Sequence, residues 1–228
     1  MNDEVGIIIA AAGISARLGQ DKLFLPLGGK PVLAWSVDAC QSHADINQIV
    51  IVLHKNNIDK GQRLTCKRNW AKVKQICPGG ERRQDSVYAG LKCLADCRWV
   101  LIHDGARPFL TAAMITDGLS AVMDTGAAAA AVPVKDTIKF CREYNIVTST
   151  PLRTNLWSVQ TPQVFRFDII HAAFREISTD VTDDAALVEK LGSEVKLYMG
   201  SYQNIKITTP EDLSLARLIA RELKRKCV

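Results

Sequence analysis

The sequence has 228 residues, of which 47% are hydrophobic and 23% are charged, with a formal net charge of +5 at pH 7. This composition argues against a disordered chain and predicts one large core, and the small positive surplus suits anionic small molecules as well as nucleic acid. Seven scattered cysteines without a Cys-x-x-Cys pair favour free thiols over a zinc site, and no apolar run reaches the length that spans a membrane.

The first expected element is a buried parallel strand at 5–12, a continuous apolar run that ends at Gly13. Because this strand starts so early, we expect no signal or transit peptide and a cytoplasmic protein. Further expected elements, in chain order, are a helix at 31–41, strands at 49–53 and 72–76, a helix at 84–95, a strand at 99–103, a helix from Thr111 to Met123 and a strand at 127–132. This alternation predicts an α/β fold with a mostly parallel sheet.

The alternation of helices and strands breaks at about 134–156. Two stretches of alternating residues flank a turn near 143–145, which predicts a β-arm inserted into a single domain that spans 1–228. A two-stranded arm is only marginally stable alone, so we expect it to contact a second copy of the chain. Beyond the arm we expect helices at 166–177 and from Thr182, a strand at 195–199 and a last helix opened by Thr209 and Pro210.

Ligands of such sheets bind beyond the carboxyl ends of the strands, so the loops at 11–23, 77–86 and 103–109 are of interest. The first loop combines small residues at its start with two cations, Arg17 and Lys22. Backbone N–H groups and fixed positive charge suit a triphosphate, whereas the loop matches neither the Walker pattern nor the dinucleotide fingerprint of nicotinamide oxidoreductases. The alternative is a glycine-rich surface loop with solvated cations.

The second loop contains Gly79 and Gly80, which allow close approach of a ligand, and Ser86 follows early in the next helix. A serine hydroxyl there can read the edge of a base. The alternative is a helix N-terminus whose acidic residues oppose the helix dipole.

In the third loop Asp104 stands at the end of a hydrophobic strand, where packing gives no reason for a carboxylate. One such aspartate can bind Mg²⁺ together with phosphate oxygens, and Arg107 could pair with a phosphate. The alternative is a local Asp–Arg pair in a strand-end turn. For His103 we expect packing and no catalytic role.

The chain resembles the 2-C-methyl-D-erythritol 4-phosphate cytidylyltransferase family over essentially its whole length. The matching motifs, in family order, are A-A-G-x-x-x-R-L at 11–18, D-K-x-x-x-P-L at 21–27, G-G-E-x-R at 79–83, D-S-V-x-x-G-L at 85–91, H-D-G-A-R-P at 103–108, T-P-Q at 161–163 and N-I-K-I-T-T-P-E-D-L at 204–213. The departures are small: Phe24 lies one position from a common aromatic, and Glu81 stands where aspartate is frequent.

The resemblance implies a role for each candidate residue. Those expected around the α-phosphate, as catalytic groups, are Arg17, Lys22 and Lys206. Those expected to bind the nucleotide are Ala11, Ala12, Gly13, Gly80, Glu81, Arg83 and Ser86. Those expected to bind the substrate are Asp104, Arg107, Thr137, Arg153, Thr161 and Thr182, with Asp104 also serving Mg²⁺. The resemblance further implies a Rossmann-like domain that works as a homodimer, with Thr137 and Arg153 on the arm reaching into the partner subunit.

The implied reaction joins CTP and 2-C-methyl-D-erythritol 4-phosphate into 4-diphosphocytidyl-2-C-methyl-D-erythritol and pyrophosphate, in non-mevalonate isoprenoid synthesis, with no nucleic acid or membrane partner. A ribitol 5-phosphate cytidylyltransferase is the nearest alternative. Those relatives often carry a bulkier residue in the D-G-A-R-P segment, so Ala106 favours the methylerythritol substrate. A non-catalytic nucleotide-binding regulator is the alternative of another class, and the set of cations together with Asp104 argues against it.

Overall fold

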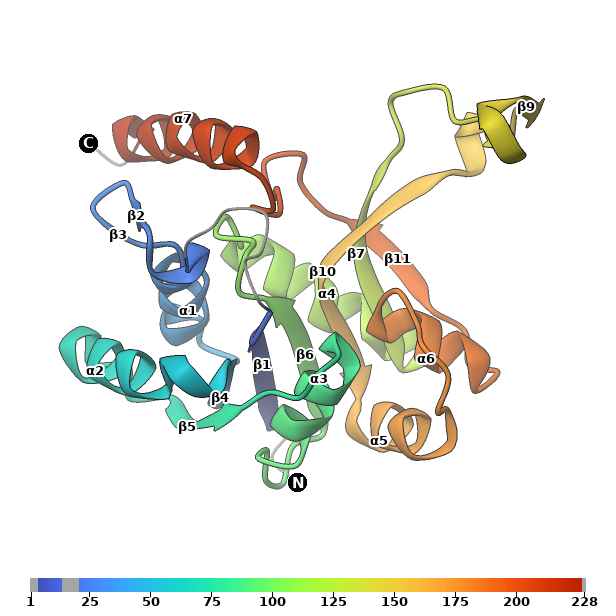
Figure 1. Ribbon diagram of the computed structural model, residues 1–228. Coiled ribbons are helices and arrows are strands. Elements are labelled where there is room, and N and C mark those ends of the chain that lie inside the picture. The colour runs from blue at the N-terminus through green and yellow to red at the C-terminus, as the bar shows by residue number, and fades with distance from the viewer. Residues whose placement is uncertain (1–3, 14–20, 227–228) are drawn as a thin grey trace.

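A seven-stranded sheet forms the centre of the molecule in the computed structural model, which describes residues 4–13 and 21–226 (Figure 1). The strand order is β11-β7-β10-β6-β1-β4-β5. These strands are β1 (Val5–Ala11), β4 (Gln48–Leu53), β5 (Val73–Pro78), β6 (Trp99–Asp104), β7 (Ala127–Pro133), β10 (Trp157–Arg166) and β11 (Lys196–Met199). Neighbouring strands are parallel except at β10, which runs antiparallel to both β6 and β7. The expected α/β fold with a mostly parallel sheet is confirmed.

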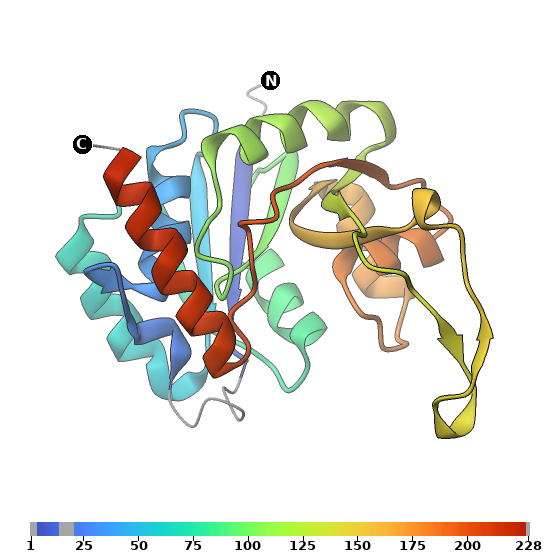
Figure 2. The same cartoon turned by 90° about the horizontal axis from the view of Figure 1, so that it is seen from above.

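Helices cover both faces of the sheet (Figures 1 and 2). They are α1 (Val32–Ser42), α2 (Ile58–Arg68), α3 (Arg83–Leu91), α4 (Ala112–Thr125), α5 (Phe167–Glu176), α6 (Asp184–Lys190) and α7 (Pro210–Lys226). Successive residues of a strand point to opposite faces, so Ile7 and Ile9 of β1 pack with α1 and α4, while Ile8 packs with α3. This double burial explains why the central strands read as continuous apolar runs.

The helix ends follow the expected capping chemistry, with one correction. The Thr111 hydroxyl accepts a hydrogen bond from the N–H of Met114 at 3.2 Å, which opens α4 as predicted. Thr209 precedes α7 and donates its N–H to the Asp212 carboxylate at 2.8 Å. The helix expected to open at Thr182 begins at Asp184 instead, because the Asp183 carboxylate accepts the N–H of Ala186 and acts as the N-cap.

Residues between β7 and β10 leave the sheet as an arm that contains β8 (Phe140–Cys141) and β9 (Val147–Ser149), paired antiparallel. Figures 1 and 2 both show this arm standing away from the sheet and its helices. A smaller ribbon, β2 (Pro26–Leu27) with β3 (Lys30–Pro31), lies beside α7. In the described part of the chain, no helix combines the length and the apolar character needed to cross a membrane.

Several elements were not predicted from the sequence, among them α2, β10 and the ribbon of β2 and β3. Helix α2 buries little beyond Gly61 and Leu64, so it offers no wide apolar stripe. Strand β10 contains Pro162, a residue that argues against a central strand. The structure accommodates it because the register of β10 against β7 shifts between Val159 and Gln163.

Candidate active site

A cavity of about 600 Å³ opens at the carboxyl edge of the sheet, beyond β5, β4, β1 and β6. Its lining comes from segments far apart in the chain. The described residues that line it are Ala10, Ala11, Ala12, Gly13, Lys22, Leu23, His54, Lys55, Pro78, Gly79, Gly80, Glu81, Arg82, Arg83, Ser86, Asp104, Ala106, Lys206 and Thr208. Lys22 and Lys206, which are 184 positions apart in sequence, therefore face one cavity.

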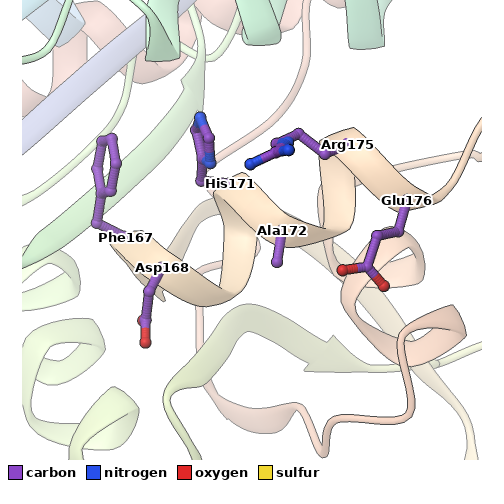
Figure 3. A pocket seen from close by; sticks show the side chains of 6 residues that line it. All are labelled: Phe167, Asp168, His171, Ala172, Arg175 and Glu176. Atoms are coloured by element: carbon purple, nitrogen blue, oxygen red, sulfur yellow. The ribbon is translucent and has the colours of Figure 1, made fainter.

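A second hollow, of about 540 Å³, is lined by six residues of α5 alone (Figure 3). Phe167, His171 and Arg175 point to one side of the helix, and Asp168 and Glu176 point to the other. These side chains do not converge, and α5 follows the carboxyl end of β10, the strand that runs antiparallel to its neighbours, so the hollow does not lie beyond the carboxyl ends of the parallel strands. The cavity beyond the strand ends is therefore the candidate active site.

The loops after β1 and β5 approach each other so closely that only glycine fits between them. A Cβ atom placed on Gly79 would lie 2.3 Å from the Cβ of Ala12 and 2.5 Å from the hydroxyl of Ser86. The Ser86 hydroxyl is buried, accepts the N–H of Gly80 at 3.1 Å and donates to the carbonyl of Arg82 at 3.2 Å. Ser86 thus fixes the glycine loop, and its contact with a base stays a prediction.

This crowding leads to a prediction for Gly79→Ala. Because the added methyl group must push Ala12 or Ser86 aside, we expect a loss of about 1–3 kcal/mol in the free energy of unfolding and a higher KM for CTP. Urea unfolding and steady-state kinetics measure the two effects. Gly13→Ala is the control for stability, because a Cβ there meets no described atom within 4 Å. Equal stability of the two variants would contradict the packing argument.

Helix α3 begins with an acidic residue in its first turn, as the alternative for the second loop expected. The Asp85 carboxylate accepts the backbone N–H of Arg82 at 3.1 Å and pairs with its guanidinium at 2.7 Å. The capped helix start and the cavity-lining glycine loop therefore occur together, and the two interpretations of this segment do not exclude each other.

Asp104 is the centre of a buried cluster of charges. The carboxylate is 6% exposed and lies 2.7 Å from the ammonium of Lys206, 3.0 Å from Nε of Arg83 and 3.9 Å from Nε of Arg107. Burial alone would raise the pKa of Asp104, but the neighbouring charges of Arg83 and Lys206 outweigh burial and hold this pKa well below its usual range. Asp104 is therefore ionised at neutral pH.

Arg107 and Thr161 support Asp104 from behind the cavity. The Thr161 hydroxyl accepts the backbone N–H of Asp104 at 3.0 Å, and the Arg107 guanidinium donates to the carbonyl of Asn204 at 2.7 Å. Neither side chain is among the described residues that line the cavity. Their direct contact with a substrate stays a prediction, whereas their contacts within the protein fix the Asp104 backbone and the segment before Lys206.

The remaining candidate residues lie elsewhere. Thr182 is exposed just before α6, and Thr137 is exposed on the arm. The Arg153 guanidinium, also on the arm, donates to the carbonyl of Lys135 at 2.7 Å. The roles of these three residues toward a substrate, including the role of the arm in a partner subunit, stay predictions. Arg17 lies outside the described residues.

His103 is fully buried beneath the cavity, as expected for a packed histidine. Its Nε2 lies 3.0 Å from the carbonyl oxygen of Arg107, and its Nδ1 lies 3.1 Å from the hydroxyl of Thr161. Burial disfavours the charged imidazolium and lowers the pKa of His103 from 6.5 to about 4. Both ring nitrogens are used in packing contacts, which leaves the ring no part in the chemistry of the cavity.

The lowered pKa of His103 predicts a weaker fold in acid. Well above pH 6.5 the ring is neutral in the folded and unfolded states, so it adds no pH dependence to the free energy of unfolding. Between pH 6.5 and about 4 only the unfolded state takes up the proton, which lowers the free energy of unfolding by up to about 3 kcal/mol. The free energy of unfolding of the ligand-free protein is measured with urea from pH 7.5 to 5. It should fall less steeply with decreasing pH in His103→Gln than in the unaltered protein. Equal slopes against pH in the two proteins would contradict this assignment.

Several residues of the site were missed at the sequence level, and three of them carry polar groups of interest. His54 and Lys55 line the cavity directly after β4, and Nδ1 of His54 accepts the N–H of Asn56 at 3.3 Å. The strand at 49–53 was predicted, and ligands of such sheets bind beyond the carboxyl ends of the strands. The loop after this strand could therefore have been included, and with it His54 and Lys55. The third is Asp184, whose carboxylate lies 2.7 Å from the guanidinium of Arg83. For Asp184 the sequence carries no comparable signal.

Among the described residues, the protein side chains alone offer a metal ion few ligands. The described residues contain no group of three or more histidine, cysteine or acidic side chains placed to bind a metal together. Asp104 is the carboxylate that lines the cavity beside two cationic side chains, Arg83 and Lys206. Mg²⁺ usually binds through one or two carboxylates plus substrate phosphates, so this donor set fits a metal that arrives with a polyphosphate.

The sequence is similar to those of known proteins. The sequence model of the 2-C-methyl-D-erythritol 4-phosphate cytidylyltransferase family matches residues 5–222. A protein of that name from Dehalococcoides mccartyi is 51% identical over 223 residues, which is 97% of this chain and 98% of the relative. Another, from Desulforamulus reducens, is 45% identical over 227 residues, which is 96% of each chain.

Solved structures agree as well. The chain is similar to 4-diphosphocytidyl-2C-methyl-D-erythritol synthase from Anaerococcus prevotii, with a TM-score of 0.86 and 30% identity over 97% of this chain and 100% of the other. It is also similar to 2-C-methyl-D-erythritol 4-phosphate cytidylyltransferase from Thermus thermophilus, with a TM-score of 0.78 and 33% identity over 96% and 99%. The chain therefore belongs to the 2-C-methyl-D-erythritol 4-phosphate cytidylyltransferase family.

Proposed function

We propose that this chain transfers the cytidylyl group of CTP to the phosphate of 2-C-methyl-D-erythritol 4-phosphate and releases pyrophosphate. The observation that carries the proposal is the convergence of Lys22, Lys206 and Asp104 on one cavity that also borders a glycine loop. Membership of the family supports this reaction over that of a ribitol 5-phosphate enzyme and over a non-catalytic regulator.

The reaction requires the protein to align the two substrates and to stabilise negative charge on the α-phosphate. The substrate phosphate is already a nucleophile near neutral pH, so the reaction needs no general base. Its oxygen attacks the α-phosphorus of CTP in line, and pyrophosphate leaves from the opposite side. Lys22 and Lys206, together with Arg17, stabilise the negative charge that grows on the α-phosphate oxygens. Asp104 would hold Mg²⁺, which neutralises the phosphates of CTP and the departing pyrophosphate when it is bound.

The nucleotide lies across the cavity in this proposal. The loop with Gly80 and Glu81, held by Ser86, receives cytosine through its backbone groups, and Arg83 lies beside it. The small residues at 11–13 let the ribose and phosphates approach the backbone after β1 closely. The rest of the cavity, toward Asp104, receives the methylerythritol.

One assay tests the reaction and its alternatives together. The purified protein is incubated with CTP, Mg²⁺ and either 2-C-methyl-D-erythritol 4-phosphate or ribitol 5-phosphate, and pyrophosphate is measured. We expect rapid release with the first substrate and loss of release when EDTA removes the metal. Faster release with ribitol 5-phosphate would favour the nearest alternative. Binding of CTP without pyrophosphate release from either substrate would favour a regulator.

We also propose that the arm pairs with a second copy of the chain. The arm exposes large apolar side chains, including Tyr144 at 92% and Leu152 at 75% exposure. The others on the arm are Ile138, Phe140, Ile146 and Val147. Apolar side chains gathered on a two-stranded ribbon indicate a surface that another protein covers, and a copy of this chain is the simplest partner.

The dimer proposal predicts that charge on the arm separates the subunits. We expect Ile146→Asp combined with Leu152→Asp to sediment as a monomer at concentrations where the unaltered protein is a dimer, because each carboxylate would lose hydration in the interface. Leu215→Asp combined with Leu218→Asp on α7 is the control, since it adds the same two charges to leucines that are 47% and 56% exposed away from the arm. A monomeric unaltered protein would contradict the proposal.

The proposal also covers the domain organisation of the chain, its location in the cell and its partners. The chain acts as one nucleotidyltransferase domain with the arm as an insertion, and it works in the cytoplasm on small molecules, without nucleic acid or membrane partners. The lack of a membrane-spanning helix in the described residues and the small-molecule substrates in the names of its relatives support this assignment. Fractionation of cells, with detection of the protein in the soluble fraction, tests the location.

A further inference from the structure

Arg83 lies between two buried carboxylates that belong to different parts of the chain. Its Nε donates to Oδ1 of Asp104 at 3.0 Å, at the end of β6. Its Nη1 lies 2.7 Å from Oδ2 of Asp184, at the start of α6. One guanidinium therefore bridges the cavity-lining aspartate and an aspartate that does not line the cavity.

Asp184 has acceptor capacity that the structure leaves unused. The side chain is 1% exposed, Arg83 approaches Oδ2 at 2.7 Å, and none of the described residues gives Oδ1 a hydrogen bond. The preceding Asp183 uses both of its oxygens, one on the N–H of Ala186 and one on the amide of Gln163. Asp183 thus provides the helix cap, and the cap gives no reason for a second buried carboxylate.

Asp104, in contrast to Asp184, is surrounded by positively charged partners. Lys206, Arg83 and Arg107 all lie within 4 Å of its two oxygens. A divalent cation that binds Asp104 is repelled by these three positive charges at short range, and the repulsion falls if one of them withdraws from the carboxylate. Arg83 is the cation of this cluster with a second carboxylate already in contact.

We propose that Asp184 is a positioning residue that takes the guanidinium of Arg83 away from Asp104 when Mg²⁺ and CTP enter the cavity. Nη1 is already 2.7 Å from Asp184, so a small rotation gives the two parallel hydrogen bonds of an arginine–carboxylate pair. That pair fills the unused acceptors of Asp184 and frees Oδ1 of Asp104 for the metal. The inference rests on the proposed role of Asp104 as the Mg²⁺ ligand.

Binding of Mn²⁺, used as a paramagnetic probe in the place of Mg²⁺, tests this exchange without turnover. The dissociation constant is measured by water proton relaxation in the presence of saturating α,β-methylene-CTP. In Asp184→Asn the neutral amide cannot hold the guanidinium as firmly, so Arg83 stays on Asp104. We expect Mn²⁺ to bind about ten-fold more weakly, within the range found for residues that support metal ligands. Asp183→Asn, one residue away and without an ion pair to Arg83, should bind Mn²⁺ within about two-fold of the unaltered protein.

A spectroscopic measurement on the unaltered protein keeps the proposal testable if Asp184→Asn does not fold. The Nε–H resonance of Arg83, assigned by its loss in Arg83→Lys, should shift when Mg²⁺ is added to the complex of the unaltered protein with α,β-methylene-CTP. An unmoved resonance in the unaltered protein would overturn the proposal.

The possible outcomes separate this inference from the proposed function. If Asp184→Asn binds Mn²⁺ as tightly as the unaltered protein and is merely less stable, then Asp184 only ties α6 to α3, and the inference fails while the metal site remains. If the unaltered complex binds no Mn²⁺, both the metal site at Asp104 and the inference are overturned.

Discussion

Replacing Lys22 with alanine is expected to lower kcat by about 10²–10³-fold, the loss found when one preorganised donor to a transition state is removed. We expect the KM for CTP to change much less, because in the proposed role the lysine stabilises charge that appears at the α-phosphorus only as the bond to pyrophosphate breaks. Lys22 lines the same cavity as Lys206 and Asp104, which is the geometry this role needs. Steady-state kinetics with pyrophosphate as the readout measure both parameters.

Lys60→Ala is the matched control for this prediction. Lys60 is half exposed on α2, lies 3.9 Å from the Asp21 carboxylate and is not among the described residues of the cavity lining. The variant removes the same charge from a neighbouring part of the surface, so we expect nearly unchanged kcat. Near-normal kcat for Lys22→Ala itself would refute the assigned role, and equal losses in both variants would point to a general effect of surface charge.

Asp104→Ala combines the largest expected loss of stability with a loss of activity. The buried carboxylate neutralises Arg83 and Lys206, and its removal leaves their charges partly uncompensated beneath the cavity. Removing one member of a buried ion pair typically costs about 3–5 kcal/mol in the free energy of unfolding. Pyrophosphate release should also fall strongly, because the proposed metal ligand is lost. Urea unfolding and the pyrophosphate assay measure the two effects.

Asp168→Ala shows how much of that loss depends on burial. Asp168 pairs with Arg166 at 2.6 Å, closer than Asp104 lies to either of its main partners, but both side chains are largely solvent-exposed. Exposed ion pairs contribute about 0–1 kcal/mol, so we expect little change in unfolding or activity. A loss of stability in Asp104→Ala no larger than in Asp168→Ala would contradict the interpretation of the cluster around Asp104.

Much of the fold could be predicted because the central strands are buried on both faces and therefore read as apolar runs. Even the alanine run at 127–132, which helix propensity alone would allow as a helix, was correctly predicted as a strand from its position between a helix and Pro133. The prediction failed at β10, where Pro162 argues against a central strand. Its antiparallel partners and the shift in register after Val159 are tertiary features that no local pattern contains.

The site residues that lie in loops after the ends of strands could be predicted from the sequence. Those whose role depends on contacts between distant residues were harder to predict. The glycine loop, Lys22 and Asp104 lie in loops that the sheet topology selects. Asp184 could not be found in this way, because its significance comes from an ion pair with Arg83 across 101 positions of the chain. The sequence shows an aspartate beside a helix cap, and only the packing of α6 against the sheet shows that it is buried.

Strand β10 joins the arm to the segment behind the candidate active site. It begins at Trp157, where the arm ends, and four residues later it presents the Thr161 hydroxyl to the backbone of Asp104. If the arm docks on a second subunit as proposed, that contact would act along a single strand on the segment that holds the backbone of Asp104.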